Sequence, residues 1–407
     1  MLIRTYADIQ SLKGNAALNP AEKKVIDNCI RGELTILGSG TRPKRSSKAR
    51  TIRADLLRYL ILGGCDQCRV HEMGVLVDGA WIVGKLDLSF ARAKGAVHLS
   101  NSTFAEPFLA SEASFDRLVL NGSSLVGLNA EGVRIRGHVL LDEAKSTGPV
   151  SFGGAEIGGQ FSCSDAELNG EQDSALNAQS AMIRGGVFLQ NLKSTGEVSV
   201  AGADIGGQLS AKGAELIGGE GFALNAQSAT IRGGAFLDNL KSTGGVSFAG
   251  SEIGAILSAR GAELIGGEGF ALNAQSARIR GSAFLDNLKS TGGVSFAGSE
   301  IGAILSAKGA KLNGGEGFAL TAQSATIRGG AFLENLKSVG EVSFAGSEIG
   351  AVLSVKEAEL DGGEGNAFNA QSATIRGTRS STILKAQARS RFPARRSMVN
   401  SHSTVPS

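Results

Sequence analysis

The stretch Ala229-Thr230-Ile231-Arg232-Gly233 decides the fold, because its Ile-Arg pair returns at one fixed interval along the chain. Each copy of the pair follows the copy before it after forty-eight residues, and the interval does not vary over six copies. The arginines of these copies, which we call the Arg row, are Arg136, Arg184, Arg232, Arg280, Arg328 and Arg376. A constant period in this range indicates a solenoid or a related array, in which each repeat packs only on its neighbours.

Each repeat divides into two units in which apolar and polar residues alternate, as in short strands. Ile253 follows Ile231 after twenty-two residues, whereas Ile279 follows Ile253 after twenty-six. The longer unit contains a Gly-rich segment at residues 265–270, which we interpret as a loop that bulges from the same corner of alternate coils. We predict an all-β parallel β-helix over residues 71–377, with coils of 22–26 residues and double repeats from about residue 135.

Equivalent residues of stacked coils lie above one another, so the repeat also predicts the packing of the core. Two sets of phenylalanines recur with the repeat, and we expect both to form interior columns. The first set is Phe188, Phe236, Phe284 and Phe332, and the second is Phe248, Phe296 and Phe344.

The two ends of the chain differ from the repeats. In residues 1–70, Asn19-Pro20 is typical of a helix start, and Gly32 marks the end of that helix. A second helix is predicted from about Ile52 to Leu62. We expect this helical head to cap the first coil, because an open solenoid end exposes unpaired strands. Residues 378–407 lack the alternation and are predicted to be a disordered basic tail, or at most a short basic helix near residues 383–391.

Charge is separated along the chain, although the net charge is only +3. Residues 1–70 carry 13 Lys and Arg against 6 Asp and Glu, and residues 378–407 carry six basic residues and no acidic ones. The part in between has a net charge of −10. Basic ends can bind an anionic membrane surface, whereas the lack of aromatic residues interleaved with them argues against nucleic acid as a partner.

The first residues contain no apolar segment typical of a secretory signal, and no run of 18 apolar residues predicts a transmembrane helix. Four Cys in 407 residues are too few for a disulfide framework. We therefore expect a cytoplasmic protein, with peripheral attachment to the inner membrane as an alternative.

Units of the form Ala-x-Ile-x-Gly-x-Leu-x-Leu, as at residues 80–88, resemble those of pentapeptide-repeat-like proteins, which form right-handed parallel β-helices. The chain is more similar to long bacterial solenoids that automated naming often labels membrane-associated oxidoreductases. This likeness covers roughly residues 20–377. It includes the segments Ile52-Arg53-Ala54-Asp55-Leu56-Leu57-Arg58, Val70-His71 and Gly79-Ala80-Trp81-Ile82. The repeats depart from the strict five-residue period of the family, because spacings of four, five, six and eleven residues mix.

The sharpest candidate for a chemical site is Cys65-Asp66-Gln67-Cys68. A Cys-x-x-Cys motif places two thiols on one turn, and His71 and Cys29 could complete a tetrahedral zinc site. Redox chemistry is a second interpretation, although the βαβ context of a thioredoxin-like motif is missing from the sequence. The third is a structural loop where the helical head meets the β-helix.

Other motifs argue against catalysis and against a bound cofactor. The segment Gly266-Gly267-Glu268-Gly269 lacks the Lys-Ser/Thr pair of a phosphate-binding loop. The sequence contains neither a strand–GxGxxG–helix unit nor a Gly-x-Ser-x-Gly elbow. We therefore predict a protein that is not an enzyme, and the oxidoreductase label of the similar solenoids has no catalytic motif to support it.

The Arg row is the strongest candidate interaction feature, and ion pairing with Glu of neighbouring coils is its alternative explanation. Our leading hypothesis is a scaffold that binds a protein partner through an acidic flank or the bulging loops. A peripheral membrane protein held by its basic ends is the second, and a redox or metal site at Cys65 and Cys68 is the third. The C-terminal coil near residues 368–376 has no visible cap, which predicts either a homodimer contact or shielding by the tail.

Overall fold

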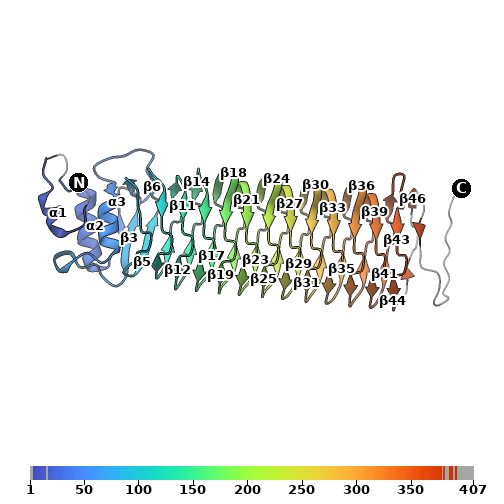
Figure 1. The fold of residues 1–407 in the computed structure, drawn as a ribbon. Helices are drawn as coiled ribbons and strands as arrows, with labels where there is room; N and C mark the ends of the chain where they lie inside the picture. Colours follow the sequence, from blue (N-terminus) through green and yellow to red (C-terminus); the bar gives the residue numbers. More distant parts are fainter. Residues whose placement is uncertain (1–2, 15–16, 378, 381–384, 388–389, 392–407) are drawn as a thin grey trace. The chain divides into compact units, whose positions relative to one another are not determined.

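The computed structural model describes residues 3–14, 17–377, 379–380, 385–387 and 390–391. The chain forms two compact units, residues 1–199 and residues 200–407. Each unit contains coils whose strands pair in parallel with the strands of neighbouring coils (Figure 1). The predicted parallel β-solenoid with short helices near its N-terminus is therefore confirmed.

The first unit begins with the helical head and continues into regular coils. Its helices are α1 (Tyr6–Ser11), α2 (Pro20–Arg31), α3 (Ala54–Ile61) and the 3₁₀ turn η2 (Asp66–Cys68). Its strands are β1 (Thr35–Ile36), β2 (Thr51–Arg53), β3 (Gly74–Asp78), β4 (Trp81–Val83), β5 (Ala96–Ser100), β6 (Thr103–Phe104), β7 (Phe108–Leu109), β8 (Ser114–Phe115), β9 (Leu118–Val119), β10 (Ser124–Leu125), β11 (Leu128–Asn129), β12 (Arg134–Ile135), β13 (Val139–Leu140), β14 (Lys145–Ser146), β15 (Val150–Ser151), β16 (Glu156–Ile157), β17 (Phe161–Ser162), β18 (Glu167–Asn177), β19 (Met182–Ile183), β20 (Val187–Phe188) and β21 (Lys193–Ser199).

The predicted first helix is α2, and a buried carboxylate near its start links it to Arg53 of β2. Asn19 and Glu22 cap the helix reciprocally, and Gly32 ends it in the left-handed conformation. The Glu22 side chain is only 1% exposed and accepts two hydrogen bonds from the Arg53 guanidinium, at 2.7 and 2.8 Å. Charge-assisted, bidentate bonds of this kind are strong and fix geometry.

The second predicted helix starts later than expected, because Ile52 belongs to a strand. Ile52 is fully buried in β2, and β2 pairs in parallel with β4. In the same way β1 pairs with β3. The head therefore supplies the first two strands of the solenoid from within residues 1–70, in addition to its helices.

From β7 to β17 the coils of the first unit have four short strands each, which define four faces, and β18 and β21 then each extend over the second and third faces. We number the faces by the strands β9, β10, β11 and β12, after which β13 pairs with β9 and starts the next coil. Phe115 pairs with Ile135 and Ile135 pairs with Ile157, so a coil of twenty residues, shorter than the predicted 22–26, precedes one of twenty-two. Pairing within a face is parallel throughout these coils.

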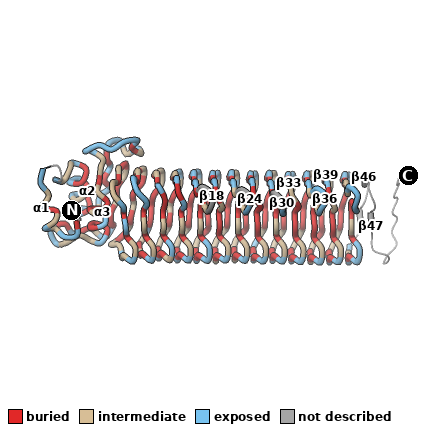
Figure 2. Tube along the Cα trace, turned by 45° about the horizontal axis from the view of Figure 1, so that its top comes forward, coloured by how far each residue is buried: buried red, intermediate tan, exposed pale blue. Residues whose placement is uncertain are grey.

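Inward-facing residues of these coils follow a five-residue spacing that the sequence alone did not reveal. Buried residues come in pairs two positions apart, and from Phe108 to Ile135 the pairs recur every five residues. These residues are Phe108, Ala110, Ala113, Phe115, Leu118, Leu120, Ser123, Leu125, Leu128, Ala130, Val133 and Ile135. After Ile135 the spacing alternates between six and five residues, which lengthens the coil to twenty-two residues and hides the period. Figure 2 shows how buried and exposed segments alternate around the coils.

The second unit repeats the same four faces with longer strands. Its strands are β22 (Asp204–Ile205), β23 (Leu209–Ser210), β24 (Glu215–Asn225), β25 (Thr230–Ile231), β26 (Ala235–Phe236), β27 (Lys241–Ser247), β28 (Glu252–Ile253), β29 (Leu257–Ser258), β30 (Glu263–Asn273), β31 (Arg278–Ile279), β32 (Ala283–Phe284), β33 (Lys289–Ser295), β34 (Glu300–Ile301), β35 (Leu305–Ser306), β36 (Lys311–Thr321), β37 (Thr326–Ile327), β38 (Ala331–Phe332), β39 (Lys337–Ser343), β40 (Glu348–Ile349), β41 (Leu353–Ser354), β42 (Glu359–Asp361), β43 (Phe368–Asn369), β44 (Thr374–Ile375), β45 (Arg379–Ser380), β46 (Lys385–Gln387) and β47 (Ser390–Arg391).

Coils of two lengths alternate in the second unit. Ile231 pairs with Ile253, and Ile253 pairs with Ile279, so the coils contain twenty-two and twenty-six residues. In the longer coils the second and third faces are joined by an 11-residue strand such as β30, whereas β33 in the next coil has seven residues. The extra residues interrupt the pairing register and form what we call an arch at the corner between these faces (Figure 1).

One of the two predicted phenylalanine columns is wrong. Phe248, Phe296 and Phe344 are fully buried, as predicted. The other column faces outward: Phe188, Phe236, Phe284 and Phe332 are only half-buried, and their neighbours Val187, Ala235, Ala283 and Ala331 face the core instead. Basic groups cover three of these outward rings, with the Arg260 guanidinium 3.7 Å from the Phe284 centroid, the Lys212 ammonium 4.7 Å from Phe236 and the Lys308 ammonium 4.9 Å from Phe332.

The predicted tail, residues 378–407, lies mostly outside the described residues, so its predicted disorder stays untested. The described parts of residues 379–391 form strands and not the short basic helix that we considered: β45 pairs with β41, β46 with β42 and β47 with β43. The described strands after residue 377 thus pair with three strands of the last complete coil.

Candidate functional site

The second face of residues 200–391 carries a charged ladder, and we call this face, with its arches, the arch face. Its first outward column holds Glu215, Lys241, Glu263, Lys289, Lys311, Lys337 and Glu359. Lys241 pairs with Glu215 at 3.4 Å, and Lys289 pairs with Glu263 at 2.6 Å. Alternating charges on neighbouring strands attract one another, so this part of the ladder is neutralised.

The ladder is broken at Lys311, which occupies the position that holds Glu in every other long coil. The equivalent residues are Glu167, Glu215, Glu263 and Glu359. Lys337 consequently pairs forward with Glu359, at 2.8 Å, and Lys289 pairs backward with Glu263. Among the described residues, Lys311 has no ion-pair partner. One uncompensated cation therefore lies between two lysines whose charges are compensated.

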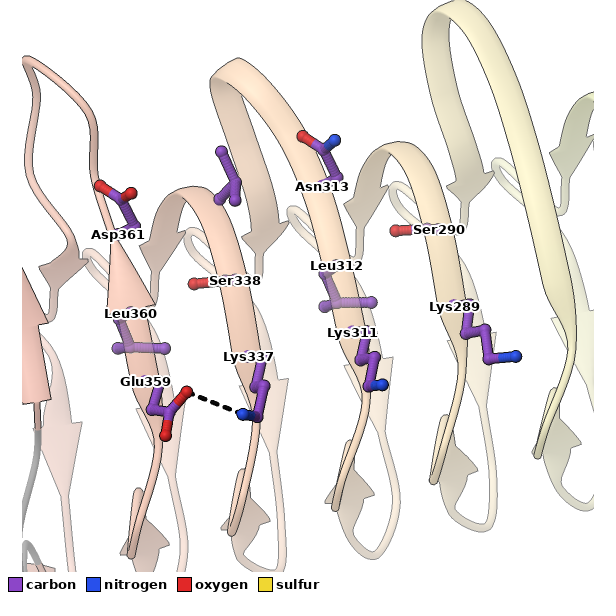
Figure 3. A pocket seen from close by; sticks show the side chains of 11 residues that line it. Lys289, Ser290, Lys311, Leu312, Asn313, Lys337, Ser338, Glu359, Leu360 and Asp361 are labelled. Carbon is purple, nitrogen blue, oxygen red and sulfur yellow. Dashed lines mark ion pairs between the residues drawn. The ribbon is translucent and has the colours of Figure 1, made fainter.

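Lys311 lies in a shallow trough of about 670 Å³ that crosses four coils. Figure 3 shows Lys289, Lys311 and Lys337 in a row on neighbouring strands, with Asn313 and Asp361 beside them toward the arches. Asn313 Oδ1 accepts a hydrogen bond from the Gly315 N–H at 3.0 Å, so its amide N–H groups remain as donors. An ammonium and an amide donor side by side are suited to bind a carboxylate.

An apolar stripe extends from the trough along the second outward column. Ile217, Ile265 and Val339 are 50%, 47% and 46% exposed. In the pairing register Thr243 stands between the two isoleucines, and Thr291 and Asn313 stand between Ile265 and Val339. The aliphatic side chains therefore alternate with polar ones, and the column offers separate apolar contacts along the arch face. The arch face thus combines an unpaired cation with an exposed aliphatic surface.

The Arg row lies at the surface on the fourth face and is only partly paired. In the first unit Arg136 Nε donates to Asp116 at 2.8 Å, and in the second Arg232 donates to Asp204 at 2.8 Å. Within the described part of the chain, Arg184, Arg280, Arg328 and Arg376 form no ion pair. Only two of the six arginines therefore have an ion-pair partner among the described residues. Both partners are Asp, whereas the alternative explanation above expected Glu.

Steric crowding explains why these arginines occur only in every second coil. Gly254, Gly302 and Gly350 take the equivalent position in the coils between them. A Cβ atom on Gly302 would lie 1.9 Å from the Arg280 carbonyl oxygen. A second side chain therefore does not fit, and the arginines are held apart along the face by the packing of the backbone.

The cysteine motif lies between α3 and β3, and the structure brings together only part of the predicted set. Cys65 and Cys68 face each other with 3.5 Å between their sulfurs. His71 Nδ1 instead accepts a hydrogen bond from the Met73 N–H. Within the described residues, no three His, Cys, Asp or Glu side chains are grouped so that they could hold a metal ion. Cys163 is a small buried residue, as its place in the repeat suggests.

The basic ends are only partly available for an anionic surface. In the loop at residues 38–50, Arg42 donates to the Gly122 carbonyl at 3.0 Å, and Arg50 donates to the Thr41 carbonyl at 2.8 Å. The basic side chains after residue 377 lie outside the described set. None of the described helices is long and apolar enough to span a membrane.

The four-sided parallel coil defines the class of this protein as a β-solenoid. Comparisons with protein-family models, with curated proteins and with solved structures found no match to the chain.

Sequence reasoning missed the most informative residue of the arch face. Lys311 could have been found by aligning the repeats with one another, because Glu occupies the position in the other long coils. The Tyr59 hydroxyl near the Cys68 thiol could not have been found in this way, since Tyr59 lies outside the repeats.

Proposed function

We propose that the protein is a non-enzymatic scaffold whose arch face binds a protein partner. The observation that carries this proposal is the break in the ladder at Lys311, with the exposed Val339 on the neighbouring strand and the exposed Ile265 two strands away on the other side. The partner segment presents an acidic side chain to Lys311 and Asn313 and an aliphatic side chain to the stripe. Protein interfaces commonly combine an apolar centre with charged groups that set orientation.

The other outward faces support this choice by contrast. Three of the four outward phenylalanines of the first face are covered by basic groups, and two of the six arginines of the Arg row are paired with Asp. Groups that are already satisfied have less to gain from a partner. On the arch face, by contrast, a cation without an ion-pair partner among the described residues and aliphatic side chains are both exposed to solvent.

The spacing of inward residues also supports the finer family assignment. Pairs of buried residues that recur every five residues between Phe108 and Ile135, on coils with four short strands, are what a pentapeptide-repeat-like β-helix needs. We propose that the chain is a divergent solenoid of that kind, in which added residues have lengthened each coil.

Site-specific photo-crosslinking in the cells that make the protein tests the proposed function. A photoreactive amino acid at position 313 should give one discrete protein adduct, whereas the same group at position 308, which is exposed beside the first face, should not. The Lys311→Glu variant should lose most of the position-313 adduct, and the matched Lys311→Arg variant should keep it. An adduct that is equal at both positions, or that persists in Lys311→Glu, would contradict the proposal.

Flotation with anionic vesicles tests the alternative of a peripheral membrane protein. The scaffold proposal expects the full chain to stay with the vesicle-free fraction at physiological salt. Salt-sensitive flotation that is lost on removing residues 378–407 would replace the proposed partner with a membrane surface.

A further inference from the structure

The turn that carries Cys65 and Cys68 is built so that its two thiols meet. The Cys68 N–H donates to the Cys65 carbonyl at 3.0 Å, which closes the chain over the intervening residues. Gly64 precedes the turn with a φ of +66°, and a Cβ atom there would lie 2.3 Å from the Cys68 carbonyl oxygen. With this turn the sulfurs are 3.5 Å apart, and a disulfide bond of about 2.05 Å requires an approach of only about 1.5 Å.

The two thiols differ in exposure and in environment. Cys65 is partly open to solvent, whereas Cys68 is 1% exposed and its thiol lies 3.7 Å from the Tyr59 hydroxyl of α3. Hydrogen bonding from Tyr59 lowers the pKa of Cys65, and burial raises the pKa of Cys68. Burial also raises the pKa of Cys29 to about 12. Cys65 is thus the accessible thiol that ionises most readily in this cluster.

We propose that Cys65 and Cys68 form a thiol–disulfide exchange site that takes small disulfides, such as glutathione disulfide, as its substrate. The Cys65 thiolate attacks one sulfur of the small disulfide, forms a mixed disulfide and releases one small thiolate. Cys68 then loses its proton to solvent, attacks the Cys65 sulfur and releases the second small thiol. Two protein thiols are oxidised to one disulfide, and one small disulfide is reduced to two thiols.

The position of the motif gives this reaction a structural consequence. Cys68 lies in η2, between the end of α3 and the first strand of the coils, and Val70 that follows is also buried. Closing the disulfide fixes the turn between the helical head and β3, while the repeats need not change. The reaction is independent of the arch face, so either proposal can fail without the other.

Thiol mapping of the full chain in glutathione redox buffers tests the proposal. The protein is equilibrated with defined mixtures of reduced and oxidised glutathione, quenched with acid, alkylated and mapped by peptide mass. We expect the wild type to lose two of four free thiols to a disulfide that joins Cys65 to Cys68. Cys65→Ser and Cys68→Ser should each prevent it, and the matched Cys163→Ser variant should form it like the wild type.

The alkylation rate of Cys65 supplies a readout that does not depend on the disulfide. Tyr59→Phe should move the pH profile of this rate to higher pH, because the variant loses the hydroxyl that stabilises the thiolate. Oxidation that stops at a glutathione adduct, a disulfide that includes Cys29, or a link between two chains would overturn the proposal. Thiols that react only after a chelator is added would also overturn it, in favour of a metal site.

Discussion

Residues 252–299 and residues 300–347 are consecutive repeats of the same length, and they differ at nine positions. None of the nine is a buried apolar side chain; every inward aliphatic or aromatic residue of one repeat is identical in the other. Three of the differences fall on the two outward columns of the arch face, where Glu263, Ile265 and Thr291 correspond to Lys311, Asn313 and Val339. The comparison teaches that the core specifies the coil while the outward positions vary, so function is to be sought where the repeats differ.

The largest expected effect tests whether the interiors of the two repeats are equivalent. Ile279→Asp and Ile327→Asp each place a charge without a partner in a fully enclosed position, which should cost about 4 kcal/mol of unfolding free energy. Because the inward neighbours are the same, both variants should shift the urea midpoint by the same amount. A difference of more than about 1 kcal/mol between them would show that the repeats are not equivalent inside.

A smaller effect is expected at the outward phenylalanines, where the repeats differ in the covering group. Phe284→Ala should cost about 1 kcal/mol more than an exposed substitution and slightly more than Phe332→Ala, because the Arg260 guanidinium lies closer to its ring than Lys308 does. The interior control Phe296→Ala should cost roughly 3–5 kcal/mol. Urea unfolding of the three variants measures how much unfolding free energy each one loses. Equal losses would show that the outward phenylalanines are packed as core residues are.

Exchanging the charges of the ladder should change stability only slightly. Lys311→Glu restores the alternation and should stabilise the protein slightly at low salt, whereas Glu263→Lys should destabilise it slightly. High salt should remove both effects. Thermal unfolding at two salt concentrations is the measurement, and a salt-independent change would mean that something other than ion pairing is altered.

The smallest effect is a pH dependence of the intact ladder. Lys289 holds the pKa of Glu263 below its ordinary range through a hydrogen bond and charge attraction. A carboxyl with a depressed pKa contributes stability above its unfolded pKa, and that contribution disappears as the pH falls through the folded pKa. The wild type should therefore lose its advantage over Glu263→Gln on acidification. An NMR titration of Glu263 with an ordinary midpoint would contradict this.

The fold could be predicted from the sequence because the same pattern of apolar and polar residues recurs in every repeat. Ile231, Ile253 and Ile279 revealed the two coil lengths, and the register pairs them. Side-chain direction was harder: in Ala235-Phe236-Leu237 the large aromatic residue faces out and the small Ala faces in, which reverses the usual reading of size and apolarity. Ile52 was assigned to a helix because its strand partner, β4, is distant in sequence.

The candidate sites could be predicted only in outline. The Cys-x-x-Cys motif is visible in the sequence, but the distance between its sulfurs and the placement of Tyr59 depend on how α3 packs. The Arg row is visible too, whereas the tight contact that restricts it to alternate coils is a property of stacking at Gly302. Features that depend on contacts between different coils need the register before they can be recognised.

A reciprocal exchange between the two repeats tests the central claim most directly. One variant carries Glu, Ile and Thr at positions 311, 313 and 339, and the other carries Lys, Asn and Val at positions 263, 265 and 291. Photo-crosslinking is then measured from one site in each repeat, position 315 or position 267. If the arch face binds its partner where the ladder is broken, the variant changed at positions 311, 313 and 339 should lose the adduct at position 315. The variant changed at positions 263, 265 and 291 should gain an adduct at position 267. Adducts that are the same in both variants as in the wild type would contradict the claim that the partner binds at the broken ladder.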